Sequence, residues 1–290
     1  MNKLALGTAQ FGLDYGISNK KGKVPHETVR DIIKAAYLAD IKFLDTAALY
    51  GNSELILGQI GVKNFKIIGK IPKLIDTDIS YAKVLLTNVK ESLFRLNIKF
   101  FEALLFHSPT QLMQSNSGIY LEALKSLKDL NLVKKIGISI YTKNNLPSEK
   151  LLKSIDIIQL PLNIVNRSLD ENGTLKKLKD YNIEIHARSV FLQGLLLIPY
   201  DDLSDYFSPW KPQWRQWHKD LIKHNTNPLR ECLLFVKKNQ YVDKVIVGVT
   251  SVKELKQIIE SFNYPTSGMD NEFMRNNDER LINPQNWKTE

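Results

Sequence analysis

The sequence predicts one α/β barrel of eight parallel strands, a (β/α)8 fold, from three observations. First, eight short β-rich runs alternate with stretches whose apolar residues recur at helical spacing, which implies parallel strands joined by crossover helices. Second, the competing open sheet should carry a G-x-G-x-x-G or G-x-x-x-x-G-K-[ST] turn, and neither occurs in the chain. Third, 290 residues is a usual size for one such barrel. We therefore expect a single domain over residues 1–290.

The predicted strands are short apolar runs, at Leu4–Gly7, Phe43–Asp45, Lys66–Lys70, Glu102–Phe106, Lys135–Ser139, Ile157–Pro161, Glu184–Arg188 and Lys244–Gly248. The predicted helices lie in the amphipathic stretches VRDIIKAAYLAD, YAKVLLTNVKESLFRL, YLEALKSLKDL, TLKKLKDY and VKELKQIIESF. Capping signals predict helix starts at Ser53 and at Thr77 or Asp78. The polar stretch 263–290 is expected either to fold over the barrel rim or to fray.

Composition excludes several classes of protein. The net charge is +9, but the lysines are scattered and no nucleic-acid module is recognisable, so we expect no nucleic-acid partner. A basic surface is either simply solvated or attracts an anionic ligand. The single cysteine, Cys232, excludes a disulfide framework and fits a cytoplasmic location. No apolar run approaches the ~20 residues of a membrane span, and Gly7 and Thr8 interrupt the first one, so we expect no signal peptide and no membrane partner.

Polar residues gather where the predicted strands end, which is the face that carries the active site in barrels of this kind. They are Asp45, Tyr50, Lys70, His107, Ser139, Gln159, Arg188, Ser189, Gly248, Thr250 and Ser251. Singly, Asp45 suits a helix cap, Tyr50 a packing position, Lys70 the surface and His107 a turn. Together they place an acid, a phenol, an amine and an imidazole at one rim, from three consecutive strands.

This combination makes a general acid. Tyrosine has a reference pKa of about 10 and is a reluctant proton donor at neutral pH. A nearby Lys70 ammonium would lower the pKa of Tyr50, and a partly buried lysine needs a counter-ion, which Asp45 supplies. A neutral His107 would hydrogen-bond a substrate oxygen and direct it to the phenol. We interpret the set as a proton donor for a carbonyl oxygen, which requires a cofactor to supply hydride.

The motifs LDTAALYGNSE, IIGKIPKL, ALLFHSP, KIGISIY and IVGVTSVKEL, in this order and spacing, resemble the aldo-keto reductase family over Leu4 to about Phe262. GISIY, IQLPLN and RSVFLQGLL resemble a bacterial branch often associated with sugar or surface-polysaccharide metabolism. The resemblance implies a TIM barrel that binds a nicotinamide cofactor along its rim. Because the first predicted strand begins at Leu4, we expect the family's N-terminal hairpin plug to be absent.

The resemblance implies one role for each residue of the tetrad. Tyr50 would be the acid and Lys70 the residue that tunes its pKa. Asp45 would be the partner of Lys70, and His107 would orient the substrate. The implied cofactor-binding residues are Gly7, Thr8, Asp45, Ser139, Gln159, Arg188, Ser189, Phe191, Gln193, Gly194, Gly248, Thr250, Ser251, Lys253, Glu254 and Gln257.

Three positions depart from the family pattern. Ile140 replaces the asparagine that usually follows Ser139, which leaves Ser139 and Gln159 as partners of the nicotinamide amide. Arg188 stands where many members stack an aromatic ring on the nicotinamide, and a flat guanidinium can stack as well. Glu254 stands about where an arginine often stands, and it would repel the 2′-phosphate of NADPH.

The choice of coenzyme depends on the residues after the eighth strand. Gly248 and the amides that follow can bind phosphate at a helix N-terminus. Lys253 and Lys256 would offset the charge of Glu254. The habit of the family favours NADPH, with NADH as the alternative.

We therefore expect an NAD(P)H-dependent oxidoreductase that reduces the carbonyl group of an aldehyde or ketone, with a sugar or nucleotide-linked sugar as the small-molecule substrate. Two alternatives stay open: a cofactor-sensing binding module with vestigial activity, and a Schiff-base lyase or aldolase that uses Lys70 as nucleophile. The second needs a neutral Lys70, which Asp45 opposes. No contiguous apolar helix face demands a partner, so we expect a monomer or a weak homo-oligomer.

The segment FSPWKPQWRQWH places Trp210, Trp214 and Trp217 on one helical face. This pattern indicates either core packing or an aromatic wall over cofactor and substrate. No histidine has the spaced partners of a metal site, so we expect no metal.

Overall fold

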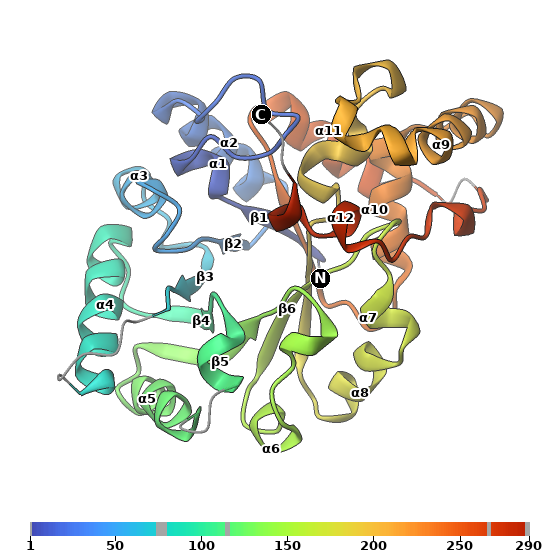
Figure 1. The fold of residues 1–290 in the computed structure, drawn as a ribbon. Coiled ribbons are helices and arrows are strands. Elements are labelled where there is room, and N and C mark those ends of the chain that lie inside the picture. Colours follow the sequence, from blue (N-terminus) through green and yellow to red (C-terminus); the bar gives the residue numbers. More distant parts are fainter. Residues whose placement is uncertain (1, 74–79, 114–116, 266–267, 288–290) are drawn as a thin grey trace.

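A computed structural model of the chain describes residues 2–73, 80–113, 117–265 and 268–287. Its eight strands form a closed barrel in sequence order, and every neighbouring pair is parallel, including β8 with β1 (Figure 1). The strands are β1 Leu4–Gly7, β2 Phe43–Asp45, β3 Lys66–Ile71, β4 Phe101–Phe106, β5 Val133–Ser139, β6 Ile157–Pro161, β7 Glu184–Arg188 and β8 Lys244–Gly248. The predicted (β/α)8 architecture is therefore confirmed, and only β3, β4 and β5 are longer than the sequence predicts.

Helices follow the strands and cover the outside of the barrel (Figure 1). They are α1 Ala9–Gly12, α2 His26–Leu38, α3 Ser53–Ile60, α4 Tyr81–Leu96, α5 Ser117–Asp129, α6 Glu149–Leu152, α7 Ser168–Glu171, α8 Thr174–Asp180, α9 Lys211–Lys223, α10 Pro228–Lys238, α11 Val252–Asn263 and α12 Glu279–Ile282. Short 3-10 helices connect them, at Pro109–Met113, Lys143–Asn145, Leu192–Leu197, Tyr200–Asp202, Asp205–Trp210, Glu272–Met274 and Pro284–Asn286. A helix begins at Ser53, but the N-cap position belongs to Asn52 and has no side-chain cap, so the predicted capping role of Ser53 is wrong. The predicted start at Thr77 or Asp78 lies outside the described residues.

Strand register brings the predicted site residues to one rim. Gly7, the last residue of β1, pairs with Asp45 of β2 on one side and with Gly248 of β8 on the other. On the opposite side of the barrel, Ser139 of β5 pairs with Gln159 of β6. Because all strands are parallel, these strand ends surround one mouth of the barrel.

The apolar core has two parts. Ala5, Phe43, Ile68, Ala103, Leu105, Ile157 and Ile246 are buried together as a separate small cluster of strand residues. A larger cluster joins the remaining strand residues to the helices. The barrel interior is thus filled by side chains, as is usual for eight strands, and the open space lies at the rim.

The tryptophan segment belongs to the core. Trp214 and Trp217 on α9 are among the largest fully buried side chains, and Trp210, which directly precedes α9, is also buried. Of the two interpretations of this segment, the structure supports packing.

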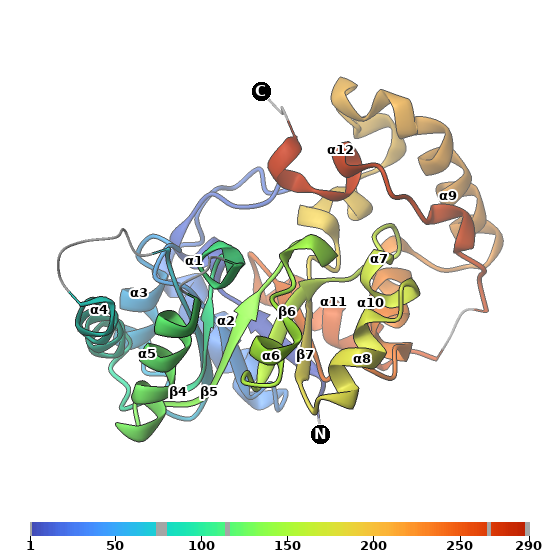
Figure 2. The same cartoon turned by 60° about the horizontal axis from the view of Figure 1, so that its bottom comes forward.

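The C-terminal segment folds back over the rim, the first of the two outcomes expected for it. Figure 2 shows α12 beyond the ends toward which the strands point. Arg167 holds this segment by hydrogen bonds to Glu272 at 2.6 Å and to the backbone oxygen of Asn271 at 2.6 Å. Leu281 is fully buried, and the ring of Trp287 packs 5.2 Å from that of Phe207. In the described ranges, no helix combines the length and the apolar character that a membrane crossing requires.

Candidate active site

A buried ion pair lies at the centre of the rim. Nζ of Lys70 donates to Oδ2 of Asp45 at 2.5 Å, and each residue is only 3% exposed. Gln159 donates from Nε2 to the second carboxylate oxygen, Oδ1, at 2.7 Å. Thr46 accepts a further, longer hydrogen bond from Lys70 at its backbone oxygen, 3.3 Å away. Both charges are therefore compensated, which a buried pair requires.

Tyr50 and His107 complete the cluster. Nζ of Lys70 lies 3.4 Å from the phenol oxygen of Tyr50, within reach of a hydrogen bond. The rings of Tyr50 and His107 meet edge to face, with centroids 5.8 Å apart. The four residues singled out from the sequence are thus brought together from β2, the turn after β2, β3 and the end of β4.

Close backbone contact fixes the position of Tyr50. A Cβ atom added to Gly12 would lie 1.8 Å from the carbonyl oxygen of Tyr50, so only glycine fits there. Gly51, which follows Tyr50, has a φ of 54°, and an added Cβ would lie 2.3 Å from the carbonyl oxygen of Gly12. Ser53, the first residue of α3, does not cap its own helix but donates to the backbone oxygen of Thr8 at 3.0 Å. The turn that carries the phenol is therefore fastened to the first strand and α1.

The protonation of Tyr50 differs from the sequence expectation. Burial raises the pKa of the phenol well above its ordinary value, the Asp45 carboxylate raises it further, and Arg188 opposes both. The expected net lowering of this pKa is therefore wrong for the resting site, because burial and the Asp45 charge together outweigh the neighbouring positive charge. Tyr50 consequently carries its proton throughout the neutral range, as an acid must.

Burial also sets the charge states of the other two groups. Burial lowers the pKa of the Lys70 ammonium below its ordinary value, and the ion pair with Asp45 offsets only part of that lowering. The pKa of His107 falls to about 4, because burial and the Lys70 charge both disfavour the imidazolium. Nδ1 of His107 is buried and has no hydrogen-bond partner among the described residues. His107 is therefore neutral at physiological pH, as the sequence analysis expected.

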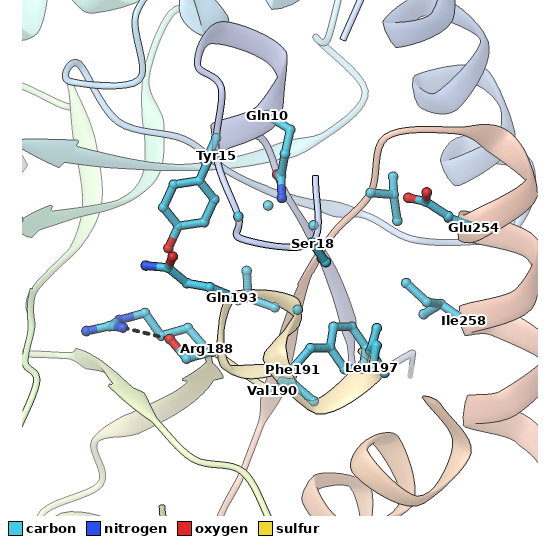
Figure 3. Close-up of a pocket in the computed structure, with 18 of the residues that line it drawn as sticks. Gln10, Tyr15, Ser18, Arg188, Val190, Phe191, Gln193, Leu197, Glu254 and Ile258 are labelled. Atoms are coloured by element: carbon cyan, nitrogen blue, oxygen red, sulfur yellow. Dashed lines mark hydrogen bonds between the residues drawn. The ribbon is translucent and has the colours of Figure 1, made fainter. Parts of the chain in front are cut away.

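A cavity of about 980 Å³ opens above this cluster. In Figure 3, Tyr15 and Arg188 lie on one side of it, and Glu254 and Ile258 of α11 lie on the other. Fourteen of the sixteen predicted cofactor residues line it, namely Gly7, Thr8, Asp45, Ser139, Gln159, Arg188, Ser189, Phe191, Gln193, Gly194, Gly248, Thr250, Glu254 and Gln257.

The other two predicted cofactor residues, Ser251 and Lys253, are not in the cavity lining. Ser251 caps α11 by accepting a hydrogen bond from the backbone of Glu254. Lys253 is exposed, and it is not part of the described cavity lining. Lys256, expected to assist it, is likewise exposed and outside that lining.

Sequence reasoning missed one wall of the cavity. The loop after α1 contributes Tyr15, Ser18, Lys20 and Lys21 to the lining, and its Ile17 amide donates to the backbone oxygen of Gln193 at 3.1 Å. This hydrogen bond joins the loop after β1 to the loop after β7 across the mouth. The signal was available, because loops that follow barrel strands form this face. By contrast, no sequence signal marked Tyr141, or Arg230 near the start of α10, as part of the lining.

Arg188 is held across the rim. One nitrogen, Nη2, donates to the backbone oxygen of Ile140 at 2.8 Å, and Nη1 donates to Oγ of Ser189 at 3.0 Å. Its Cζ lies 4.2 Å from the ring centroid of Tyr141. Among the described residues, no carboxylate lies within ion-pair distance of Arg188. Arg188 therefore places a positive charge without an ion-pair partner beside the Lys70–Asp45 pair.

A closed parallel barrel with this phenol, ion pair and imidazole at its rim has the arrangement of a barrel oxidoreductase, and a sequence comparison shows the family. A profile of the Aldo/keto reductase family matches residues 3–277. The chain therefore belongs to the aldo-keto reductase family. A comparison with curated proteins finds no match.

Solved structures agree on the fold. The holo form of aldo-keto reductase AKR11C1 from Bacillus halodurans superposes with a TM-score of 0.73 at 18% identity, covering 91% of this chain and 87% of that one. Glycerol dehydrogenase AKR11B4 from Gluconobacter oxydans gives a TM-score of 0.70 at 20% identity, covering 92% and 88%. At these identities the likeness shows the shared barrel and nothing about substrate.

The two other kinds of site are a metal centre and a Schiff-base lysine. Within the part of the chain that the structure describes, no group of three or more His, Cys, Asp or Glu side chains is placed to hold a metal ion. His186, inside β7, is fully buried and meets Glu184 at 2.8 Å. A Schiff-base mechanism needs a neutral Lys70. Burial favours that form and lowers the pKa of Lys70, whereas the carboxylate 2.5 Å from Nζ opposes loss of the proton.

Proposed function

We propose that the protein reduces an aldehyde or ketone to an alcohol with NAD(P)H, using Tyr50 as the proton donor. One observation carries this proposal: a protonated phenol lies 3.4 Å from an ammonium that is itself held 2.5 Å from a carboxylate, all beneath one large cavity. Membership of the aldo-keto reductase family supports the same chemistry.

The cavity fits a nicotinamide dinucleotide. Small-molecule pockets usually measure about 300 to 1,000 Å³, and a cavity of about 980 Å³ leaves room for a coenzyme together with a substrate. The paired strand ends at Ser139 and Gln159 offer a hydroxyl and an amide to the nicotinamide carboxamide. When bound, the coenzyme supplies the hydride that no side chain of the rim can supply.

The residues of the tetrad would each perform one step. The neutral His107 orients the carbonyl oxygen toward Tyr50, and the phenol donates its proton to that oxygen as negative charge develops on it. The Lys70 ammonium, 3.4 Å away, then stabilises the phenolate that remains. Asp45 holds Lys70 in place, and Gln159 holds Asp45. Because these donors are buried and prepositioned, little reorganisation accompanies proton transfer.

The substrate we propose is a sugar or a nucleotide-linked sugar. The guanidinium of Arg188, which has no ion-pair partner, suits a substrate that carries a carboxylate or phosphate, and Tyr15 and Tyr141 line the same cavity as Arg188. The C-terminal segment would help to select the substrate, because Glu279 and Asn283 line a small cavity together with Arg188 and Tyr141. If Arg188 also stacks on the nicotinamide through its free face, its charge would favour the reduced over the oxidised, cationic ring.

The test is a reduction assay that follows coenzyme absorbance with three matched aldehydes: a neutral alkyl aldehyde, a neutral sugar and a phosphorylated sugar. We expect turnover, with the highest kcat/KM for the anionic sugar. Arg188→Met should lower that value by at least ~10-fold and the value for the neutral aldehyde much less. Coenzyme binding without turnover of any carbonyl would instead favour the sensing-module alternative. Borohydride trapping of a substrate on Lys70 would favour the Schiff-base alternative.

The remaining proposals concern coenzyme, location and assembly. The habit of the family favours NADPH, whereas the turn after β8 favours NADH. A cytoplasmic location is supported by a single cysteine, Cys232, which is fully buried in α10. We also propose a monomer or a weak homo-oligomer, which size-exclusion chromatography with light scattering would test.

A further inference from the structure

The turn between β8 and α11 forms hydrogen bonds to a carboxylate of the chain itself, that of Glu254. Ser251 caps α11, accepting the backbone N–H of Glu254 at Oγ, 3.2 Å away. The carboxylate of Glu254 then folds back over the turn. Its Oε2 accepts the backbone N–H of Thr250 at 2.7 Å, and its Oε1 accepts the Thr250 hydroxyl at 2.8 Å. Both carboxylate oxygens are therefore held at the edge of the cavity.

The donors that Glu254 occupies are those an incoming phosphate would need. Backbone N–H groups at a helix N-terminus and a nearby hydroxyl are a usual phosphate site. Here the N–H of Thr250, its hydroxyl and the N–H of Glu254 all have partners from within the turn. A second anion at this place would be repelled by the Glu254 carboxylate, and these donors would already be engaged in hydrogen bonds.

The positive charges expected to offset Glu254 do not reach this place. Lys253 and Lys256 are exposed and lie outside the described cavity lining, whereas Glu260 contributes a second carboxylate to it. Among the described residues of α10 and α11, Arg230 is the one cationic side chain in that lining, and the other cations that line the cavity, Lys20 and Lys21, belong to the loop after α1. Its guanidinium is stacked 3.5 Å from the ring centroid of Tyr264, so it offers a flat surface as well as a charge.

We propose that Glu254 makes this protein select NADH over NADPH. This inference rests on the proposed function, because it assumes that the adenosine half of the coenzyme reaches α11. The 2′-hydroxyl of NADH would donate to the Glu254 carboxylate, as an acidic residue does in other NAD sites. The 2′-phosphate of NADPH carries close to two negative charges and is repelled by the same carboxylate. The expected selectivity is at least ~10-fold in Kd, equal to about 1.4 kcal/mol.

The experiment titrates the full chain with NADH and NADPH and follows quenching of tryptophan fluorescence. Isothermal titration with 5′-AMP and 2′,5′-ADP isolates the adenosine end from the nicotinamide. We expect the ligand without the 2′-phosphate to bind at least ~10-fold more tightly within each pair. Glu254→Gln should reduce this preference by ~10-fold or more, chiefly by strengthening NADPH, because glutamine keeps the helix start but loses the charge. These wild-type ratios need no variant and stand even if a substitution disturbs folding.

Two controls make the outcome decisive. Glu122→Gln removes the same charge from an exposed position on α5, outside the described cavity lining, and should leave both Kd values unchanged. Arg230→Gln should weaken the binding of NADH and of NADPH about equally. The proposal is overturned if the wild type prefers NADPH or binds both equally. It is also overturned if Glu254→Gln behaves like Glu122→Gln, or if Arg230→Gln weakens NADPH alone. Failure of all four ligands to bind would instead refute the proposed function.

Discussion

Replacing Asp45 by asparagine should destabilise the protein in a way that depends on pH. The substitution keeps the size of the side chain and an oxygen that can accept from Gln159. It removes the charge that lies 2.5 Å from Nζ of Lys70, a group whose side chain is 1% exposed. Lys70 must then stay charged without a counter-ion, or lose its proton on folding.

Deprotonation of Lys70 sets an upper limit on the decrease in the free energy of unfolding. Lysine has a reference pKa of about 10.4, and the free energy of removing its proton changes by about 1.4 kcal/mol per pH unit, so deprotonation at pH 7 costs about 4.6 kcal/mol. This agrees with the ~3–5 kcal/mol typical of breaking one side of a buried pair. At pH 9 the same upper limit falls to about 1.9 kcal/mol. Because the unfolded chain binds the extra proton, the stability of the variant rises with pH toward that of the wild type.

The assay is urea unfolding at pH 7, 8 and 9, followed by tryptophan fluorescence. With a slope of about 3 kcal/mol per molar urea, the expected loss at pH 7 lowers the midpoint by ~1–1.5 M. The double variant Asp45→Asn/Lys70→Met is the control. It lacks the buried ammonium, so its loss should be smaller and independent of pH. A loss below ~1 kcal/mol at pH 7, or an equal loss at pH 7 and pH 9, would refute the buried pair.

Three further predictions concern other parts of the site and core. His107 is neutral when folded, with a pKa of about 4. As the pH falls from 6.5 to 4, the free energy of unfolding of the wild type should therefore decrease by up to ~3 kcal/mol more than that of His107→Gln, measured by urea unfolding. An equal decrease in both proteins would contradict this. Gly12→Ala should displace Tyr50 and lower kcat by at least ~10-fold with little change in coenzyme Kd, whereas Gly118→Ala, which meets nothing within 4 Å, should leave both unchanged. Trp217→Ala should lose ~3–5 kcal/mol of stability, and Trp217→Phe less, without changing coenzyme affinity, because this side chain is core rather than cavity wall; a changed Kd would argue otherwise.

Most of the barrel and the tetrad were predictable because they depend on local patterns. The run at Phe43–Asp45 ends in an acid where a strand meets the rim, and parallel pairing carries Asp45 beside the end of β1 whatever the loops do. Lys70 and His107 follow by the same argument from their own strands. Ser139 and Gln159 were also predictable, since their strands are neighbours in register.

What the sequence could not provide is the direction of side chains within a turn and the degree of burial. Lys253 and Glu254 are adjacent in the first turn of α11, yet only the glutamate lines the cavity. Hydrophobic periodicity does not decide between two polar neighbours. Likewise, Tyr50 is buried enough that desolvation outweighs the charge of Arg188 on the pKa of its phenol, and the sequence does not show how deeply a side chain is buried. The role of Tyr15 depends on a loop that crosses the mouth, which has no periodicity to detect.

The most direct test of the central claim is a single-turnover experiment on Tyr50→Phe with reduced coenzyme deuterated at the transferred position. The wild type should move deuterium to the carbonyl carbon of a turned-over aldehyde. The variant should bind coenzyme with a Kd within ~2-fold of the wild type and transfer the label at least ~100-fold more slowly, because it lacks the proton donor. Transfer by the variant at the wild-type rate, or a wild-type product without deuterium on that carbon, would contradict the assignment of Tyr50 as the acid of a carbonyl reductase.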